Sequence, residues 1–334
     1  MSDAPLAVTP GEPAGVGVDL ALGLWAVRTA ETPAFFLIDD PERVAARARL
    51  LGIAAALTPI DDPREAVAAF PSALPVLRHA FPAQSVPGRP DPANGPATVD
   101  AITRAVALVR AGDAAAVVTN PIQKETLYQA GFTHPGHTEY LAALSGPDVV
   151  PVMLLASPEL KVVPVTIHIP LAEVPRQLTT GKIVTTARIT AVALQRDFGI
   201  AQPRLALAGL NPHAGEGGAL GREDGDIIAP AVAALRAEGI DARGPLPADT
   251  LFHEEARATY DVVLGMYHDQ VLVPIKTLDF WGGVNVTLGL PFVRTSPDHG
   301  TALTLAGTGK ARIDSLRAAV ELARAMSRRR AAAQ

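Results

Sequence analysis

The stretch YDVVLGMYH, residues 260–268, is an apolar run that ends in a histidine. Val and Leu in a run of this length are typical of a strand that is buried on both faces of a parallel sheet. The polar residue after such a strand lies at the carboxyl edge of the sheet, where α/β proteins bind their ligands. The stretch therefore predicts an α/β fold with a ligand site beside His268.

Two further apolar runs also end in a histidine. They are VVPVTIH, residues 162–168, and RLALAGLNPH, residues 204–213. A single histidine in such a position is more often an ordinary hydrogen-bonded residue than a metal ligand. Three imidazoles at one sheet edge would suit a divalent transition metal with an open coordination position. The sequence thus predicts a metal site formed by His168, His213 and His268.

Length and composition narrow the class of protein. A chain of 334 residues is long for one domain, which favours two lobes. Its hydrophobic content of 48% with only 4% aromatics is usual for α/β folds. The net charge of −5, without long runs of like charge, gives no reason to expect nucleic acid or an anionic membrane as a partner. Because the chain has no cysteine, His and carboxylates must supply any metal ligands.

The sequence shows neither an export signal nor an apolar stretch of about 18 residues that could span a bilayer. We therefore expect a soluble cytoplasmic protein.

Strand and helix patterns alternate along most of the chain. Strands are expected at residues 6–9, 34–38, 115–119, 150–156, 161–166, 204–208 and 261–266. Helices are expected from near residue 19, at 41–52, at 97–111, before 131, and at 180–197, 227–238 and 315–330. A short Ser-Pro turn between the strands at 150–156 and 161–166 predicts an antiparallel pair in an otherwise parallel sheet.

Three loops allow two interpretations each. PGEPAGVG, residues 10–17, could receive an anion at a helix start or could be a tight turn without a ligand. In HPGHTE, residues 134–139, Thr138 could cap the next helix, or His137 and Thr138 could bind a phosphate or carboxylate. NPHAGEGGALG, residues 211–221, is either a long solvent loop or a loop folded around a ligand, and its glycine content favours the second.

The stretch from Tyr267 to Arg294 combines charged residues with apolar ones. Lys276 and Arg294 flank Asn285, a pattern that fits a pocket for a small, doubly anionic ligand. Asp249 and Asp298 could each be a catalytic base or a plain turn residue, and Asp269 is a further candidate base.

Several motifs together resemble one known family. In chain order they are PGEPAGVG, VTNPIQK, GHTEYLA, TIHIPL, GLNPHAGEGG, GPLPADTLF, MYHDQ and GVNVTLGLPFVRTSPDHGTA. The chain resembles the 4-hydroxythreonine-4-phosphate dehydrogenase (PdxA) family of pyridoxal 5'-phosphate biosynthesis over nearly its whole length. Val18 departs from the family, which often has Pro there, and residues 61–95 are the least similar segment.

The resemblance implies a single catalytic unit of two α/β lobes. The implied fold is like that of isocitrate and isopropylmalate dehydrogenases, with mostly parallel mixed sheets and the active site in the cleft between the lobes. It also implies a homodimer whose subunits share each active site. The cofactor would be NAD(P), for which we identify no binding residues, together with one divalent metal ion: Zn, Mg or Co.

Family positions fall on residues already selected. The metal ligands fall on His168, His213 and His268. The substrate-binding positions fall on His137, Thr138, Lys276, Asn285 and Arg294. We expect the catalytic residues to be Lys276, Asp249 and Asp269.

The implied reaction is the oxidation of 4-phosphooxy-L-threonine to 2-amino-3-oxo-4-phosphooxybutanoate, which decarboxylates to 3-amino-2-oxopropyl phosphate. A dehydrogenase of a 4-phosphorylated sugar acid, such as threonate or erythronate 4-phosphate, would use the same residues. A hydrolase with a three-histidine metal site is a further alternative. A non-enzymatic solute-binding protein would be expected to carry an export signal.

Overall fold

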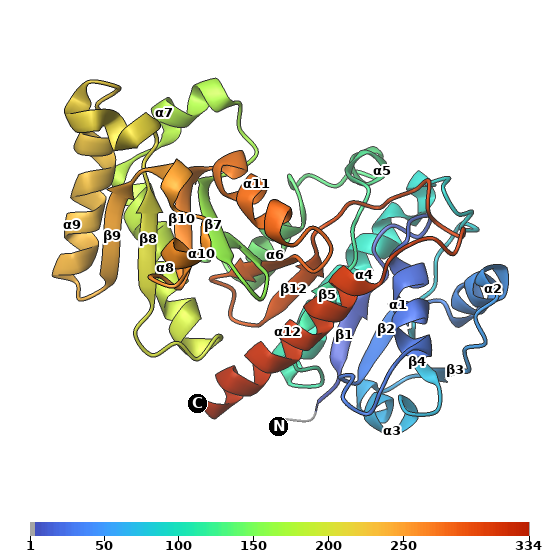
Figure 1. Ribbon diagram of the computed structural model, residues 1–334. Helices are drawn as coiled ribbons and strands as arrows, with labels where there is room; N and C mark the ends of the chain where they lie inside the picture. Colours follow the sequence, from blue (N-terminus) through green and yellow to red (C-terminus); the bar gives the residue numbers. More distant parts are fainter. Residues whose placement is uncertain (1–3, 334) are drawn as a thin grey trace. The chain divides into compact units, whose positions relative to one another are not determined.

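The computed structural model describes residues 4–333, which form two compact units (Figure 1). Unit 1 contains residues 4–151 and 290–332, and unit 2 is Val152–Gly289. The chain leaves unit 1, builds unit 2 and then returns, so unit 1 is assembled from two separate segments.

Every strand pair in the sheet of unit 1 is parallel, and the strand order is β3-β4-β2-β1-β5-β12. The strands are β1 (Leu6–Thr9), β2 (Phe35–Asp39), β3 (Leu57–Ile60), β4 (Leu74–Arg78), β5 (Val117–Thr119) and β12 (Arg294–Pro297). The helices are α1 (Gly17–Ala26), α2 (Pro41–Leu51), α3 (Ala66–Ala69), α4 (Gly95–Ala111), α5 (Lys124–Gln129), α6 (His137–Ser145) and α12 (Asp314–Ala332). Two short 3-10 turns, η1 (Pro63–Glu65) and η2 (Pro92–Asn94), complete the unit.

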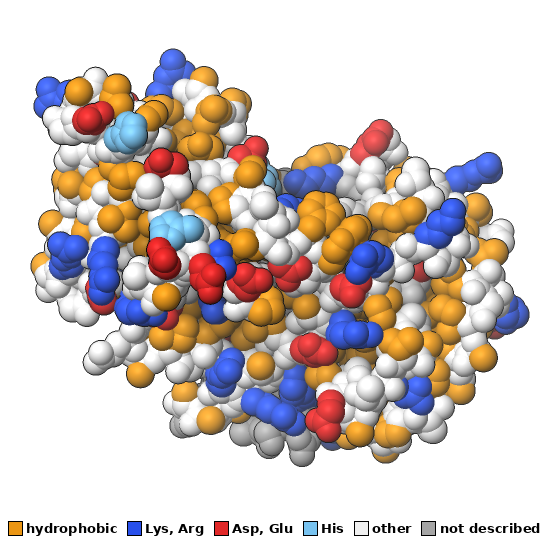
Figure 2. Space-filling view, viewed as in Figure 1, with side chains coloured by type: hydrophobic (Ala, Val, Ile, Leu, Met, Phe, Trp, Pro, Cys, Tyr) orange, Lys and Arg blue, Asp and Glu red, His pale blue; other side chains and the backbone are white. Residues whose placement is uncertain are grey.

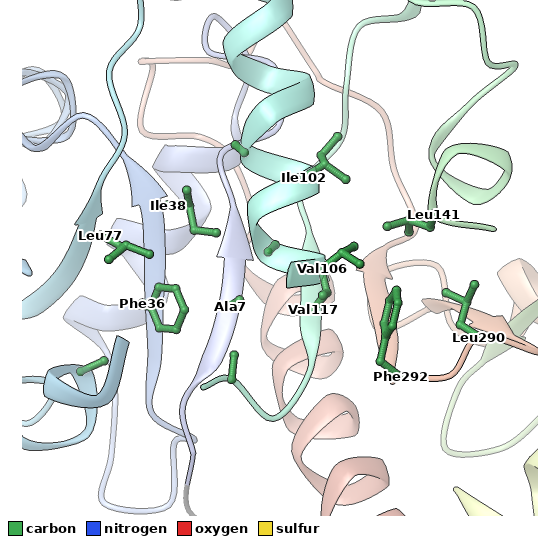
Figure 3. Packing of buried hydrophobic residues seen from close by; sticks show 14 of the residues in the cluster. Ala7, Phe36, Ile38, Leu77, Ile102, Val106, Val117, Leu141, Leu290 and Phe292 are labelled. Atoms are coloured by element: carbon green, nitrogen blue, oxygen red, sulfur yellow. The ribbon is translucent and has the colours of Figure 1, made fainter. Parts of the chain in front are cut away.

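Helix α4 covers one face of this sheet, as Figure 3 shows. Its buried Ile102 and Val106 lie four residues apart and therefore share one helix face. They pack with Ala7 of β1 and with Phe36 and Ile38 of β2 in one buried cluster. Phe36 and Ile38 belong to the same cluster because alternate residues of a strand point to the same side.

Unit 2 contains a mixed sheet of order β11-β6-β7-β10-β8-β9. The strands are β6 (Val152–Ala156), β7 (Lys161–Thr166), β8 (Arg204–Ala208), β9 (Asp241–Leu246), β10 (Val262–Tyr267) and β11 (Val284–Leu288). The pairs β6–β7 and β6–β11 are antiparallel, whereas β7–β10, β10–β8 and β8–β9 are parallel. The predicted antiparallel pair is confirmed.

Helix α11 (His268–Leu278) begins directly after β10 and covers one face of this sheet. Its Val271, Leu272 and Ile275 join a buried cluster with residues of β6, β7, β8 and β10. The other helices are α7 (Val174–Gln177), α8 (Thr180–Arg196), α9 (Ala229–Ala237) and α10 (Glu254–Arg257). Shorter turns are η3 (Leu171–Glu173), η4 (Pro212–Gly218), η5 (Asp224–Ile228) and η6 (Ala248–Thr250).

The α/β class and most predicted elements are confirmed. Asp40 caps α2 through its side chain, Pro41 is the first helical residue and Gly52 ends the helix with φ of 66°. The prediction that Thr138 caps a helix is wrong, because α6 begins one residue earlier and Gly136 holds the cap position. A cleft between two lobes as the location of the active site stays a prediction.

No helix within residues 4–333 is long and apolar enough to cross a bilayer. On the face drawn in Figure 2, basic and acidic side chains are interspersed.

A buried ion pair fixes the PGEPAGVG loop in unit 1. Arg47 of α2 pairs with Asp19 of α1, and both side chains are almost fully buried. The guanidinium also donates to the carbonyl oxygens of Pro13 and Gly15, at 3.3 and 3.1 Å, while Asp19 accepts the backbone N–H of Gly307. The pair thus joins α1, α2 and two loops.

We expect the substitution Arg47→Met to lower the free energy of unfolding by about 3–5 kcal/mol, since it leaves a buried carboxylate without its cation. Urea unfolding followed by circular dichroism measures this. The control is Arg243→Met, which breaks an exposed pair with Asp241 at 3.4 Å. Its expected effect is below about 1 kcal/mol, and equal effects of the two variants would contradict the prediction.

Candidate active site

The three predicted metal ligands follow three neighbouring strands of unit 2. β10 lies between β7 and β8 in a parallel arrangement, so the carboxyl ends of these three strands meet at one edge. His168 lies two residues after β7, His268 directly after β10, and His213 in the loop that follows β8. The sheet order therefore brings the three loops together.

His168 and His268 lie next to each other. Their ring centres are 5.8 Å apart, and both line a cavity of about 250 Å³ together with Thr166 and Tyr267. Two imidazoles on one cation have ring centres roughly 5 Å apart, because metal–nitrogen bonds are about 2.0–2.1 Å long. The observed separation is thus close to the one that a shared cation requires.

The carboxylate of Asp269 is hydrogen-bonded to the imidazole of His268. Its Oδ1 lies 2.6 Å from Nδ1 of the imidazole. A carboxylate that accepts the Nδ1 proton leaves Nε2 as the free donor atom and fixes the orientation of the ring, as is usual for metal-bound histidines. The donor set at His268 therefore fits a metal ligand.

His213 begins a run of left-handed backbone. Residues 213–217 all have positive φ, between 42° and 79°, and three of them are not glycine. Each non-glycine residue in this conformation costs about 1–2 kcal/mol. Backbone strain of this kind gathers at functional sites, where the surrounding structure must hold it.

Asp224 holds the start of this loop. The side chain is buried and accepts the backbone N–H groups of Leu210 and Asn211 at 2.8 and 3.2 Å. It also accepts Nδ2 of Asn211 at 2.9 Å. Within residues 4–333, no three His, Cys, Asp or Glu side chains are close enough to hold a metal ion, so His213 does not complete a site with the other two histidines.

A second group of predicted residues gathers in unit 1. His137 at the start of α6 is close enough to Arg294 of β12 and Lys124 of α5 for both cations to act on its charge. The Nε2 atom of His137 is buried and has no hydrogen-bond partner among residues 4–333. Arg294 is 3% exposed and donates to Oγ1 of Thr119 at the end of β5.

The electrostatics of this group favour an anion. Burial, followed by the charges of Arg294 and Lys124, holds the pKa of His137 well below its usual value, so its ring is neutral. Burial lowers the pKa of Arg294 to about 10, while Glu139 opposes this shift. Two cations, the buried Arg294 and the exposed Lys124, together with an unpartnered ring nitrogen are what a phosphate or carboxylate group would satisfy.

Of the remaining predicted substrate residues, one lies beside His137 in unit 1 and two lie in unit 2. Thr138 is the second residue of α6, next to His137. In unit 2, Lys276 lies near the end of α11 and Asn285 lies on β11. The Oδ1 atom of Asn285 is buried without a hydrogen-bond partner, which is rare in proteins and marks a position for a ligand or water.

The two candidate bases are exposed. Asp249 lies in η6, which contacts the His213 turn η4, and no hydrogen bond ties its side chain down among the described residues. The carboxylate of Asp269 is hydrogen-bonded to His268. This arrangement fits a carboxylate that orients the imidazole ring better than one that is free to accept a proton from the substrate. The catalytic roles of Asp249, Asp269 and Lys276 stay predictions.

The structure decides between the two interpretations of PGEPAGVG. The N–H groups of Glu12 and Val16 donate to the carbonyl oxygens of Pro121 and Thr301, and that of Ala14 donates to the Glu12 side chain. A Cβ at Gly11 would lie 2.5 Å from the Pro121 oxygen. The loop is therefore a tightly packed turn in which these three N–H groups are bonded within the protein.

Lys124 was missed as a site residue. The motif VTNPIQK places it just after β5, and the sheet order puts β5 beside β12, which carries Arg294. Neighbouring parallel strands deliver their following residues to one edge, which is the signal that could have found it.

The family model for the pyridoxal phosphate biosynthetic protein PdxA matches residues 31–323. The chain belongs to the PdxA family. The 4-hydroxythreonine-4-phosphate dehydrogenase of Methylorubrum populi is 57% identical to it, over 98% of this chain and 95% of that protein. This similarity makes the chain an enzyme of the oxidoreductase class.

Solved structures of the PdxA family agree with the fold. The 4-hydroxythreonine-4-phosphate dehydrogenase of Klebsiella pneumoniae has a TM-score of 0.88 at 39% identity, covering 97% of this chain and 99% of that one. A terephthalate 1,2-cis-dihydrodiol dehydrogenase of Burkholderia xenovorans has a TM-score of 0.65 at 30% identity, covering 96% and 98%. The fold thus accommodates dehydrogenases with different substrates.

We expect Lys124→Met to raise the pKa of His137, since removing a nearby positive charge favours the protonated ring. A pH titration of histidine ring signals by NMR measures this. The signal of His253, which is exposed and lies in unit 2, should be the same in both proteins. An unchanged His137 titration would show that Lys124 does not act on it.

The lowered pKa of His137 also predicts how the free energy of unfolding depends on pH. Below about pH 6.5 His137 binds a proton in the unfolded chain but stays unprotonated in the folded protein. Stability is therefore lost as the pH falls from there toward the folded-state pKa. His137→Asn should reduce this loss in urea unfolding at pH 5 to 7, and an identical pH profile in both proteins would contradict it.

Proposed function

We propose that the chain oxidises 4-phosphooxy-L-threonine with NAD(P) to 2-amino-3-oxo-4-phosphooxybutanoate, which decarboxylates to 3-amino-2-oxopropyl phosphate. The observation that carries this proposal is the group of His137, Lys124 and Arg294 in unit 1, in which Arg294 is buried and Lys124 is exposed to solvent. A phosphorylated substrate would satisfy this group, and the relatives from Methylorubrum populi and Klebsiella pneumoniae are named for one.

In the proposed reaction, the phosphate or carboxylate of the substrate binds Arg294 and Lys124, while His137 donates Nε2–H. The buried guanidinium suits this role because it is held by Thr119 and needs little reorganisation. Lys276 and Asn285 contact the remaining polar groups of the substrate. One of Asp249, Asp269 and Lys276 accepts the hydroxyl proton.

We propose that His168, His213 and His268 hold one divalent metal ion, Zn, Mg or Co. When bound, such an ion lowers the pKa of a coordinated hydroxyl group and polarises a carbonyl group. The pairing of His168 with His268 and the Asp269 contact support this. The chain's own contribution is to present imidazoles from the loops after β7, β8 and β10.

We also propose a homodimer with shared active sites. Exposed apolar side chains on and just after α11, namely Val273, Phe280 and Trp281, would be covered by the second copy. The cytoplasmic location stays a prediction.

Metal binding is the first test. We expect His268→Ala to weaken Co²⁺ binding by at least about 100-fold and to abolish NADH formation, because it removes one proposed ligand. Isothermal titration and a nicotinamide absorbance assay measure the two effects, with His253→Ala as the control. Turnover of a substrate without nicotinamide would instead favour the metal hydrolase.

Substrate choice is the second test. We expect Arg294→Met to lower kcat/KM for 4-phosphooxy-L-threonine by about 10–100-fold, the value of one charge-assisted hydrogen bond. Arg243→Met, on an exposed pair, should leave it unchanged. Erythronate 4-phosphate is assayed in parallel, and a higher kcat/KM for it would replace the proposed substrate with the sugar acid.

A further inference from the structure

A chain of short hydrogen bonds joins the three strand ends that carry the histidines. Thr166, the last residue of β7, donates its hydroxyl group to the carbonyl oxygen of Met266 at 2.7 Å. The Met266 N–H in turn donates to Oε1 of Gln270 at 2.6 Å. The Nε2 atom of Gln270 donates to the carbonyl oxygen of Gly209, also at 2.6 Å.

These bonds begin where main-chain pairing stops. The ladder between β10 and β8 ends at Leu264 and Leu207. Beyond it, β8 continues to pair with β9 up to Ala208, so no main-chain bond of the β8–β10 ladder fixes Met266 relative to Gly209. The side-chain amide of Gln270 spans this gap and acts as the next rung of the ladder.

Each bonded residue is close in sequence to one histidine. Thr166 and Met266 each precede a histidine by two residues, and Gly209 precedes His213 by four. Over two to four residues the chain has few degrees of freedom, so fixing these three points restricts the spacing of the three rings.

The close approach of Gln270 depends on Gly265. A Cβ at this position would lie 2.3 Å from Cγ1 of Val271 and 3.1 Å from Oε1 of Gln270. Because the position has no side chain, α11 can turn back onto β10 at once. Gln270 thereby reaches the end of the strand that precedes its own helix.

We propose that Gln270 and Thr166 are positioning residues that hold the ends of β7, β10 and β8 together, so that His168, His213 and His268 can reach one metal ion. This inference rests on the proposed three-histidine metal site. Neither residue touches the metal: Gln270 fixes the His213 loop to the end of β10, and Thr166 fixes the end of β7 to it. The site would be assembled by side chains that are not themselves ligands.

The test is a Co²⁺ titration of the full-length protein, followed by calorimetry and by the visible absorption bands of the bound ion. Gln270→Met removes the amide with little change in size. Thr166→Val removes the hydroxyl group and keeps the shape, while Thr166→Ser keeps the hydroxyl group. We expect Gln270→Met and Thr166→Val to bind Co²⁺ about 10–100-fold more weakly, with altered absorption bands at saturation.

The controls separate positioning from folding. Thr166→Ser should bind Co²⁺ as the wild type does, and so should Gln195→Met, which alters an exposed glutamine on α8. Far-UV circular dichroism confirms folding; if Gln270→Met fails to fold, the comparison of Thr166→Val with Thr166→Ser carries the test. A loss of stability alone would leave the bands of the saturated site unchanged.

Two negative results have different meanings. If the variants bind Co²⁺ with wild-type affinity and wild-type bands, the positioning role is wrong and the metal site stands. If the wild type and His268→Ala bind Co²⁺ equally, the metal site itself is wrong, and this inference fails with it.

Discussion

The parallel pairing of β10 with β7 on one side and with β8 on the other is the constraint on which unit 2 depends. It brings the loops after three separate stretches of sequence to one sheet edge, and the hydrogen bonds of Thr166 and Gln270 extend the connection past the last main-chain rung. Two of the three imidazoles lie side by side there. The sheet thus places two of the three proposed metal ligands side by side, and the loops after its strands present their side chains.

Unit 1 buries the charged side chains of Arg47 and Arg294 in different surroundings. Arg47 is matched by Asp19 and by carbonyl oxygens, which makes it a structural group. Arg294 is equally buried and donates to the hydroxyl group of Thr119, and burial lowers its pKa to about 10. Arg47 thus belongs to the scaffold, whereas the lowered pKa of Arg294 is the kind of perturbation that gathers at functional sites.

Periodicity in the sequence was enough for β1, β2, β5, β6, β7, β8 and β10, and for the antiparallel pair, because these segments are continuous apolar runs. It missed β3, β4, β11 and β12, although the last three are largely buried. It missed β9, whose sequence DARGPL is polar and partly exposed, and it missed α11, which contains Pro274. At the site, strand ends located the histidines correctly along the chain. The action of Lys124 on His137 and the bridge from Gln270 to Gly209 arise from contacts between segments that are apart in the sequence, which no local pattern encodes. His268 and Asp269 are adjacent, but their hydrogen bond depends on how the two side chains are oriented.

The left-handed turn at residues 213–217 limits how this enzyme can change. Replacing Ala214 or Glu216 with glycine would relieve the turn and raise thermal tolerance, but it would also loosen the direction in which His213 points. Thermal stability and a fixed orientation of the His213 side chain therefore place opposite demands on these two positions. Variants selected only for survival at high temperature would drift toward a more relaxed turn and poorer use of the histidine.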